Sequence, residues 1–108
     1  MEEAVTTNAQ FSIGDLVQHK LFDYRGVVVD VDPCLMLPDE WYEAVARSRP
    51  PKDQPWYRVL VHDSTHDTYV AERNLEPDTS VAPVRHPMIE TCFQSFSDGH
   101  YLPAGRMN

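Results

Sequence analysis

The segment Arg25-Gly26-Val27-Val28-Val29-Asp30-Val31 decides the fold class, because it is the clearest β-strand in the chain. It is rich in valine, whose β-branched side chain favours extended backbone. Successive side chains of a strand point to opposite faces, so Val27, Val29 and Val31 are expected to share one face. Asp32-Pro33 follows, and proline cannot continue a hydrogen-bonded ladder. The pattern therefore predicts a strand that ends at this dipeptide.

Further short strands flank this segment on both sides. Leu16-Val17-Gln18-His19 precedes it, and Trp56-Tyr57-Arg58-Val59-Leu60-Val61 is a second strong strand. His62-Asp63-Ser64-Thr65-His66-Asp67 is rich in turn-forming residues, and residues 68–71 pair back as the next strand. Residues 72–75 indicate one helical turn before a final short strand. The sequence therefore predicts a mainly β domain, either a small barrel or a partly open sheet, of about five strands.

One short helix is expected between the second and third strands, at residues 38–47. Proline and acidic residues open this segment, and Arg47 and Arg49 close it, which suits the helix dipole. The proline-rich residues 50–55 then form a stiff linker. The expected inward-facing residues are Trp41, Ala44, Val45 and Ser48.

The two ends of the chain differ from its centre. Residues 1–10 are polar and without periodicity, which predicts a disordered leader before a domain at residues 11–78. Residues 79–108 form a separate C-terminal tail. Its apolar side chains recur at helical spacing, which predicts a short helix packed on the barrel or on a neighbouring subunit. These residues are Ile89, Cys92, Phe93 and Phe96.

The charge of the chain argues against a nucleic-acid-binding protein of the usual kind. Nine basic and seventeen acidic residues give a net charge of −8, and the excess acid lies in the first 78 residues. Such a field repels phosphates, whose neutralisation supplies most non-specific DNA affinity. DNA binding would require the basic residues to gather on one face; these are Lys20, Arg25, Arg47, Arg49, Lys52, Arg58 and Arg73. Of these, Arg47, Arg49 and Lys52 lie close enough in sequence to form a local DNA-binding patch.

The sequence also indicates where in the cell the protein is expected. No apolar run approaches the roughly 20 residues that a membrane helix needs. The acidic start at residues 1–7 lacks the basic and apolar pattern of a signal peptide, so we expect a cytoplasmic protein. Cys34 and Cys92 lie far apart, and two reduced thiols are expected there, although a disulfide stays open.

The polar residues do not assemble into a recognisable catalytic or metal site. His62 and His66 could be metal ligands at a four-residue spacing, but they flank an expected hairpin turn. Cys34 or Cys92 could pair with a histidine, yet nothing fixes their geometry. We therefore expect a protein that is not an enzyme and needs no metal or cofactor.

Aromatic side chains are the candidates for protein contacts. Trp56 and Tyr57 point to opposite faces of their strand, so one is expected in the core and the other at the surface. Deletion of residues 87–108 is expected to leave the barrel folded and to remove a contact surface. The full candidate set is Trp56, Tyr57, Tyr69, Phe93, Phe96 and Tyr101.

Three blocks of the sequence resemble the HspQ family of bacterial heat-shock proteins, also called YccV-like or hemimethylated-DNA-binding domains. The first comprises Gly14-Asp15-Leu16-Val17-Gln18-His19 and Tyr24-Arg25-Gly26-Val27-Val28-Val29-Asp30-Val31-Asp32-Pro33. The second is Pro55-Trp56-Tyr57-Arg58-Val59-Leu60-Val61, and the third is Tyr69-Val70-Ala71-Glu72-Arg73-Asn74-Leu75. Together they cover roughly residues 11–77.

Two residues depart from the pattern of that family. Asp23 stands where the family often has glycine, and Arg73 stands where a second acid is usual. Aspartate tolerates left-handed backbone better than most residues, so the expected turn can be kept at Asp23.

The resemblance implies an SH3-like barrel and a role in the heat-shock stress response. It implies a non-catalytic adaptor that promotes degradation of certain proteins, including the replication initiator DnaA, by the Lon protease. As the alternative, it implies a protein that binds hemimethylated DNA near the replication origin. The acidic composition favours the adaptor. Short edge strands and an apolar tail also predict a homo-oligomer.

Overall fold

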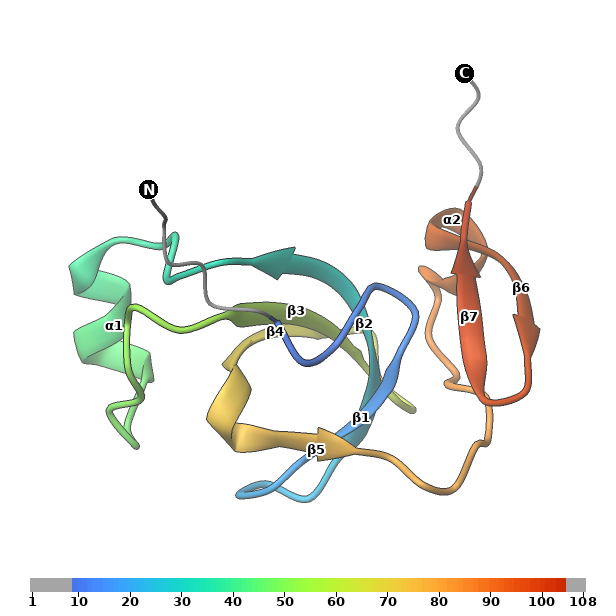
Figure 1. Cartoon of the computed structure of the whole chain (residues 1–108), viewed down its shortest axis with the longest axis horizontal. Helices are drawn as coiled ribbons and strands as arrows, with labels where there is room; N and C mark the ends of the chain where they lie inside the picture. The colour runs from blue at the N-terminus through green and yellow to red at the C-terminus, as the bar shows by residue number, and fades with distance from the viewer. Residues whose placement is uncertain (1–8, 105–108) are drawn as a thin grey trace, which may run out of the picture.

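The structure is a computed structural model that describes residues 9–104, and it is mainly β with few helices (Figure 1). The strands are β1 (Leu16–His19), β2 (Arg25–Asp32), β3 (Trp56–Val61), β4 (Asp67–Ala71), β5 (Leu75–Pro77), β6 (Phe93–Ser97) and β7 (His100–Pro103). The helices are α1 (Asp39–Val45), the 3₁₀ turn η1 (Glu72–Asn74) and α2 (Ile89–Cys92). No helix in this part of the chain is long and apolar enough to cross a membrane.

The larger sheet contains five antiparallel strands in the order β4-β3-β2-β1-β5. Each strand falls where the sequence predicts one, so the mainly β prediction is confirmed. β4 and β5 lie at the two ends of this order and do not pair within the described residues, so the sheet is not closed. The closed SH3-like barrel therefore stays a prediction.

A β-bulge changes the alternation of side chains along β2. The pairing with β3 steps from Val28 directly to Asp30, which leaves Val29 as the extra residue. Val27 and Val29 pack against one core cluster, whereas Val31 packs with Val28 against another. The prediction that Val27, Val29 and Val31 share one face is therefore wrong at Val31, because the bulge reverses the faces.

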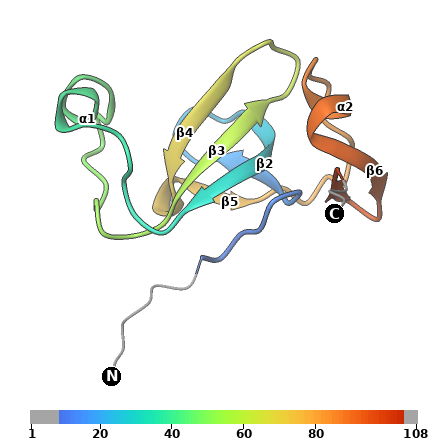
Figure 2. The same ribbon diagram turned by 90° about the horizontal axis from the view of Figure 1, so that it is seen from above.

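Hydrophobic clusters cover both faces of the sheet. The first lies on the face of Val28 and contains Phe11, Val17, Val28, Tyr57, Val59, Val70 and Leu75. The second, on the opposite face, joins the sheet to the C-terminal tail through Leu16, Val27, Leu60, Val84, Phe93 and Tyr101. The third attaches α1 and contains Tyr42, Trp56 and Ala71. Figure 2 shows α1 and the tail at opposite ends of the sheet.

Helix α1 forms where it was predicted, but it buries a different side chain. Its one buried residue is Tyr42, and the exposed fraction of Val45 is 53%. The Tyr42 hydroxyl donates a hydrogen bond to the Pro50 carbonyl at 2.7 Å. The predicted inward stripe through Ala44 and Val45 is wrong, because the linker after the helix folds back and draws in Tyr42 instead.

The tail forms a hairpin, and the short helix that was expected to include Phe93 and Phe96 ends at Cys92. Helix α2 has four residues, and Phe93 and Phe96 belong to strand β6. The side chains of Phe93 and Tyr101 are buried against the sheet. The tail does pack on the sheet, because these rings belong to a core cluster that the sheet and the hairpin share.

Gly14 is the point where the hairpin meets the sheet. Its N–H donates to the Val28 carbonyl at 2.8 Å, and its carbonyl accepts the Tyr101 N–H at 3.0 Å. Its φ of +99° lies in the region that favours glycine, and a Cβ here would lie 2.0 Å from the Tyr101 oxygen. Only glycine fits this position.

Of the predicted leader, residues 1–8 lie outside the described part. Gln10 already donates its N–H to the Glu72 carboxylate at 2.9 Å, and Phe11 is buried. Ordered contacts therefore begin within the segment predicted to be disordered.

Candidate functional site

A groove of about 410 Å³ follows strand β4. The β1–β2 turn forms one wall, and α1 with the loop after it forms the other. The groove lining includes Leu21, Phe22, Trp41, Val45, Arg47, Arg58, Asp67 and Tyr69. Three elements that are distant in sequence thus converge on one mainly apolar hollow.

The β1–β2 turn presents two apolar side chains at the rim. The exposed fraction is 71% for Phe22 and 57% for Leu21. The buried His19 holds this turn, because its Nδ1 accepts the backbone N–H groups of Leu21 and Phe22, each at 3.1 Å. Asp23 adopts the predicted left-handed backbone, with φ +59°.

The protonation state of His19 follows from these contacts. Burial lowers the pKa of its imidazole from the ordinary value of 6.5. An imidazole nitrogen accepts a hydrogen bond only when it carries no proton. The neutral form is therefore the one that holds the turn.

Stacked and edge-on aromatic rings form the opposite wall. Trp56 and Tyr69 stack with their centroids 5.3 Å apart, and Trp41 meets both rings edge-on, at 5.9 and 5.7 Å. The Tyr69 hydroxyl donates to Asp32 at 2.5 Å and accepts the Met36 N–H at 3.1 Å. Burial and the Asp32 hydrogen bond raise the pKa of Tyr69, so its hydroxyl stays protonated.

The charged groups of the groove differ in how they are paired. Arg58 donates to Asp67 at 3.0 Å, and its guanidinium lies 5.3 Å from the centroid of the Tyr69 ring. Arg47 is exposed and forms no ion pair with any described residue. The groove thus presents one cation that the described part of the chain does not neutralise.

The predicted DNA-binding patch is largely neutralised. Arg49 pairs with Glu43 at 2.6 Å, and Lys52 pairs with Asp39 at 3.2 Å. Both cations also lie over the Tyr42 ring, at 5.2 and 4.5 Å from its centroid. Five of the eight Lys and Arg residues in the described range pair with carboxylates; these five are Arg25, Arg49, Lys52, Arg58 and Arg85.

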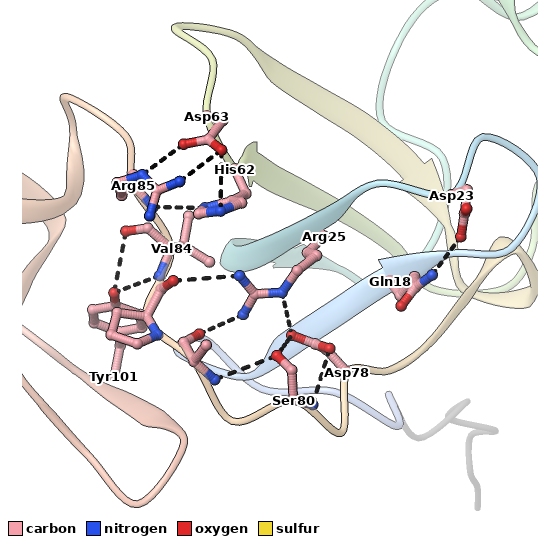
Figure 3. A network of polar contacts seen from close by, with 12 residues as sticks. Gln18, Asp23, Arg25, His62, Asp63, Asp78, Ser80, Val84, Arg85 and Tyr101 are labelled. Carbon is pink, nitrogen blue, oxygen red and sulfur yellow. Dashed lines mark hydrogen bonds and ion pairs between the residues drawn. The ribbon is translucent and has the colours of Figure 1, made fainter.

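Two of those ion pairs belong to a polar network that fastens the tail segment (Figure 3). Arg25 Nε donates to Asp78 at 2.7 Å, and Arg85 donates twice to Asp63, at 2.7 and 2.8 Å. The hydrogen bond from Arg85 lowers the pKa of Asp63. His62 Nδ1 accepts the Arg85 N–H at 2.9 Å. His62 and Arg25 thus act here as structural partners.

His66, the second histidine of the expected turn, contributes its backbone to this region. Its carbonyl lies 2.9 Å from His86 Nε2. Among residues 9–104, no three His, Cys, Asp or Glu side chains are grouped as metal ligands would be.

The aromatic residues selected from the sequence are mostly in the core. Trp56 and Tyr57 do face opposite sides, but both are buried, with exposed fractions of 1% and 0%. The prediction of one exposed ring in this pair is therefore wrong, because α1 covers the Trp56 face and the first cluster covers Tyr57. Of the remaining candidates, Tyr69 lines the groove, Phe93 and Tyr101 are buried, and Phe96 is half-buried.

Comparison with known proteins gives two results. A family model described as "Hemimethylated DNA-binding protein YccV like" matches residues 9–100. The chain is also similar to F-box only protein 21 of Homo sapiens, Mus musculus and Pongo abelii, with 34% identity over 95 residues. These alignments cover 86% of this chain, which spans 15% of the length of the curated relatives that it matches.

Proposed function

The chain belongs to the YccV-like family, and from that premise we propose that it is a non-catalytic adaptor that binds segments of other proteins. The groove along β4 is the proposed binding site. As a heat-shock adaptor it would present clients, with DnaA as the first candidate, to the Lon protease.

The observation that carries this proposal is the exposure of apolar side chains around one hollow. Phe22, Leu21 and Val45 are each more than half exposed, and they border the same groove. Exposed apolar surface gathered at a concave site is typical of protein-binding sites. Aromatic walls add contact area at a low entropic cost.

The absence of catalysis is part of the proposal. Several polar side chains that line the groove are engaged with partners, as Tyr69 is with Asp32 and Arg58 is with Asp67. Such paired groups hold a shape well and are poorly placed to transfer protons.

A cytoplasmic location and self-association also belong to the proposal. The free thiols of Cys34 and Cys92 fit a reducing compartment.

Binding of hemimethylated DNA is the second candidate, and the description of the family model favours it. The charge distribution favours the adaptor. The chain carries −8, and two residues of the predicted patch, Arg49 and Lys52, already pair with carboxylates. Phosphate contacts would have to break these ion pairs, so few counterions would be released on binding.

A degradation assay tests the adaptor proposal. Lon would be incubated with DnaA alone, with the wild-type protein, and with the double variant Leu21→Ser/Phe22→Ser. We expect wild type to accelerate loss of DnaA and the double variant to lose most of that effect. Leu102→Ser is the matched control, because Leu102 is 44% exposed and lies on β7 outside the groove lining. Equal acceleration by all three proteins would refute the groove as the binding site.

A further inference from the structure

We propose that the protein segment enters the groove as an added β-strand on β4, in extended conformation, with a carboxylate that pairs with Arg47. This inference rests on the proposed function and specifies how the partner is recognised. Three features carry it: the free edge of β4, the walls on either side of that edge, and the charge of the lining.

The free edge of β4 follows from its pairing with β3. Val61 N–H donates to the His66 carbonyl, and Glu72 N–H donates to the Pro55 carbonyl. In this register the residues that exchange hydrogen bonds with β3 are Thr68 and Val70, because such pairs alternate along an antiparallel ladder. The N–H and C=O groups of the remaining β4 residues point away from β3. These residues are Asp67, Tyr69 and Ala71.

No strand of the described residues pairs with that side of β4, which is the last strand of the sheet. Unpaired backbone groups at a sheet edge are a template for another strand. Recognition of an extended peptide by this route draws affinity from main-chain hydrogen bonds and specificity from alternate side chains.

The walls of the groove suit such alternation. The hydroxyl groups of Tyr24 and Thr68 form a hydrogen bond of 2.7 Å on the face of the first core cluster. The ring of His19 lies beside those of Tyr24 and Phe22. Trp41 and Tyr69 lie on the other face, in the cluster that attaches α1. All five of these aromatic or imidazole side chains line the one groove. An added strand would place successive side chains against the two walls in turn.

The charge of the lining selects a carboxylate on the incoming segment. Asp67 is already paired with Arg58, and the neutral form of His19 holds the turn. Arg47 is the lining cation without a described ion-pair partner. A guanidinium binds a carboxylate through two parallel hydrogen bonds. The groove is therefore locally basic within a protein of charge −8, and it complements an acidic apolar segment.

Amide hydrogen exchange tests the added strand directly. The probe is a short blocked peptide in which leucine and threonine alternate and one residue is glutamate. We expect saturating peptide to slow exchange at Asp67, Tyr69 and Ala71 by at least roughly tenfold. Thr68 and Val70, already bonded to β3, would change less. A matched peptide with N-methylated amides on its bonding edge should give no such protection.

A peptide variant and a protein variant test the charge contact separately from the added strand. Replacing the peptide glutamate by lysine should weaken binding to the wild-type protein, and Arg47→Gln should remove that preference. Lys20→Gln is the control, because Lys20 lies outside the groove lining. An unchanged preference in Arg47→Gln would overturn the assigned charge contact.

Failure of the added-strand inference can be distinguished from failure of the proposed function. Peptide binding that changes tryptophan fluorescence but leaves the three amides unprotected would overturn the added strand and keep the groove. Protection that rises with protein concentration without peptide would make a second copy of this chain the occupant, which also overturns the inference. Normal Lon stimulation by the Leu21→Ser/Phe22→Ser variant would refute the groove as the binding site, whereas no stimulation by the wild-type protein would overturn the proposed function itself.

Discussion

The rings of His19 and Phe22 stack with their centroids 4.7 Å apart, and His19 Nδ1 accepts the backbone N–H of Phe22. A buried imidazole thus supports the most exposed aromatic ring of the groove. Exposure of Phe22 is therefore a consequence of how the β1–β2 turn is held. It depends on a titratable imidazole whose pKa is lowered by burial.

The first prediction concerns pH. Because burial lowers the His19 pKa in the folded state, the unfolded chain binds this proton more readily. The contribution to stability is complete above the unfolded pKa of about 6.5 and is lost as pH falls below it. Denaturant unfolding at pH 7.5 and 5.5 should show a larger loss for wild type than for His19→Asn. Asparagine offers an oxygen acceptor that does not titrate. An equal loss in both proteins would exclude His19 as the responsible group.

The second prediction concerns Gly14. An alanine there would bring Cβ into the Tyr101 carbonyl at a backbone angle that L-residues avoid, so the hairpin would have to shift. We expect Gly14→Ala to lower the free energy of unfolding by more than about 2 kcal/mol. Ser12→Ala, two residues away and exposed, should change it by less than about 0.5 kcal/mol. Similar unfolding curves for the two variants would contradict the close approach.

The third prediction concerns the tail as part of the core. Phe93→Ala removes a buried ring from the cluster shared with Leu16 and Val27, and we expect a loss of about 3–4 kcal/mol. Leu102→Ala, on the neighbouring strand and half-exposed, should lose less than about 1.5 kcal/mol. Thermal unfolding of both variants provides the comparison. A small effect of Phe93→Ala would restore the expectation of a dispensable tail.

The fourth prediction concerns DNA. Because Arg49 and Lys52 are paired with carboxylates, binding of any duplex should be weak and should depend on few released counterions. Titrations of a hemimethylated duplex at several salt concentrations should give a slope equivalent to about two phosphates or fewer. A steep slope, lost in the Arg47→Ala/Arg49→Ala/Lys52→Ala variant, would favour the DNA-binding candidate.

Much of the fold could be predicted because it depends on local pattern. The valines of β2, the Trp56–Val61 strand and the acidic start of α1 each indicate their own conformation. The bulge at Val29 could not be predicted, because an extra residue in a strand is defined only by its partner. Phe93 and Phe96 have a helical spacing, yet their strand is stabilised by pairing with β7.

The site was harder to predict than the fold, because exposure is a tertiary property. Of the aromatic residues chosen from the sequence as protein contacts, Tyr69 lines the groove, while Trp56 and Tyr57 are buried. Phe22 was missed, since a phenylalanine in a turn gives no signal until His19 is seen beneath it. The pairing of Arg49 with Glu43 was easier to predict from the sequence, because the two residues flank the end of one short helix.

The central claim, that the groove binds protein, is tested most directly by parallel titrations with DnaA and with a hemimethylated duplex. The proteins to compare are wild type, Leu21→Ser/Phe22→Ser, and Arg47→Ala/Arg49→Ala/Lys52→Ala. We predict that the groove variant loses at least roughly tenfold in affinity for DnaA, about 1.4 kcal/mol, with no change toward DNA. Unchanged DnaA affinity in the groove variant, together with tight DNA binding that the basic-patch variant abolishes, would contradict the account.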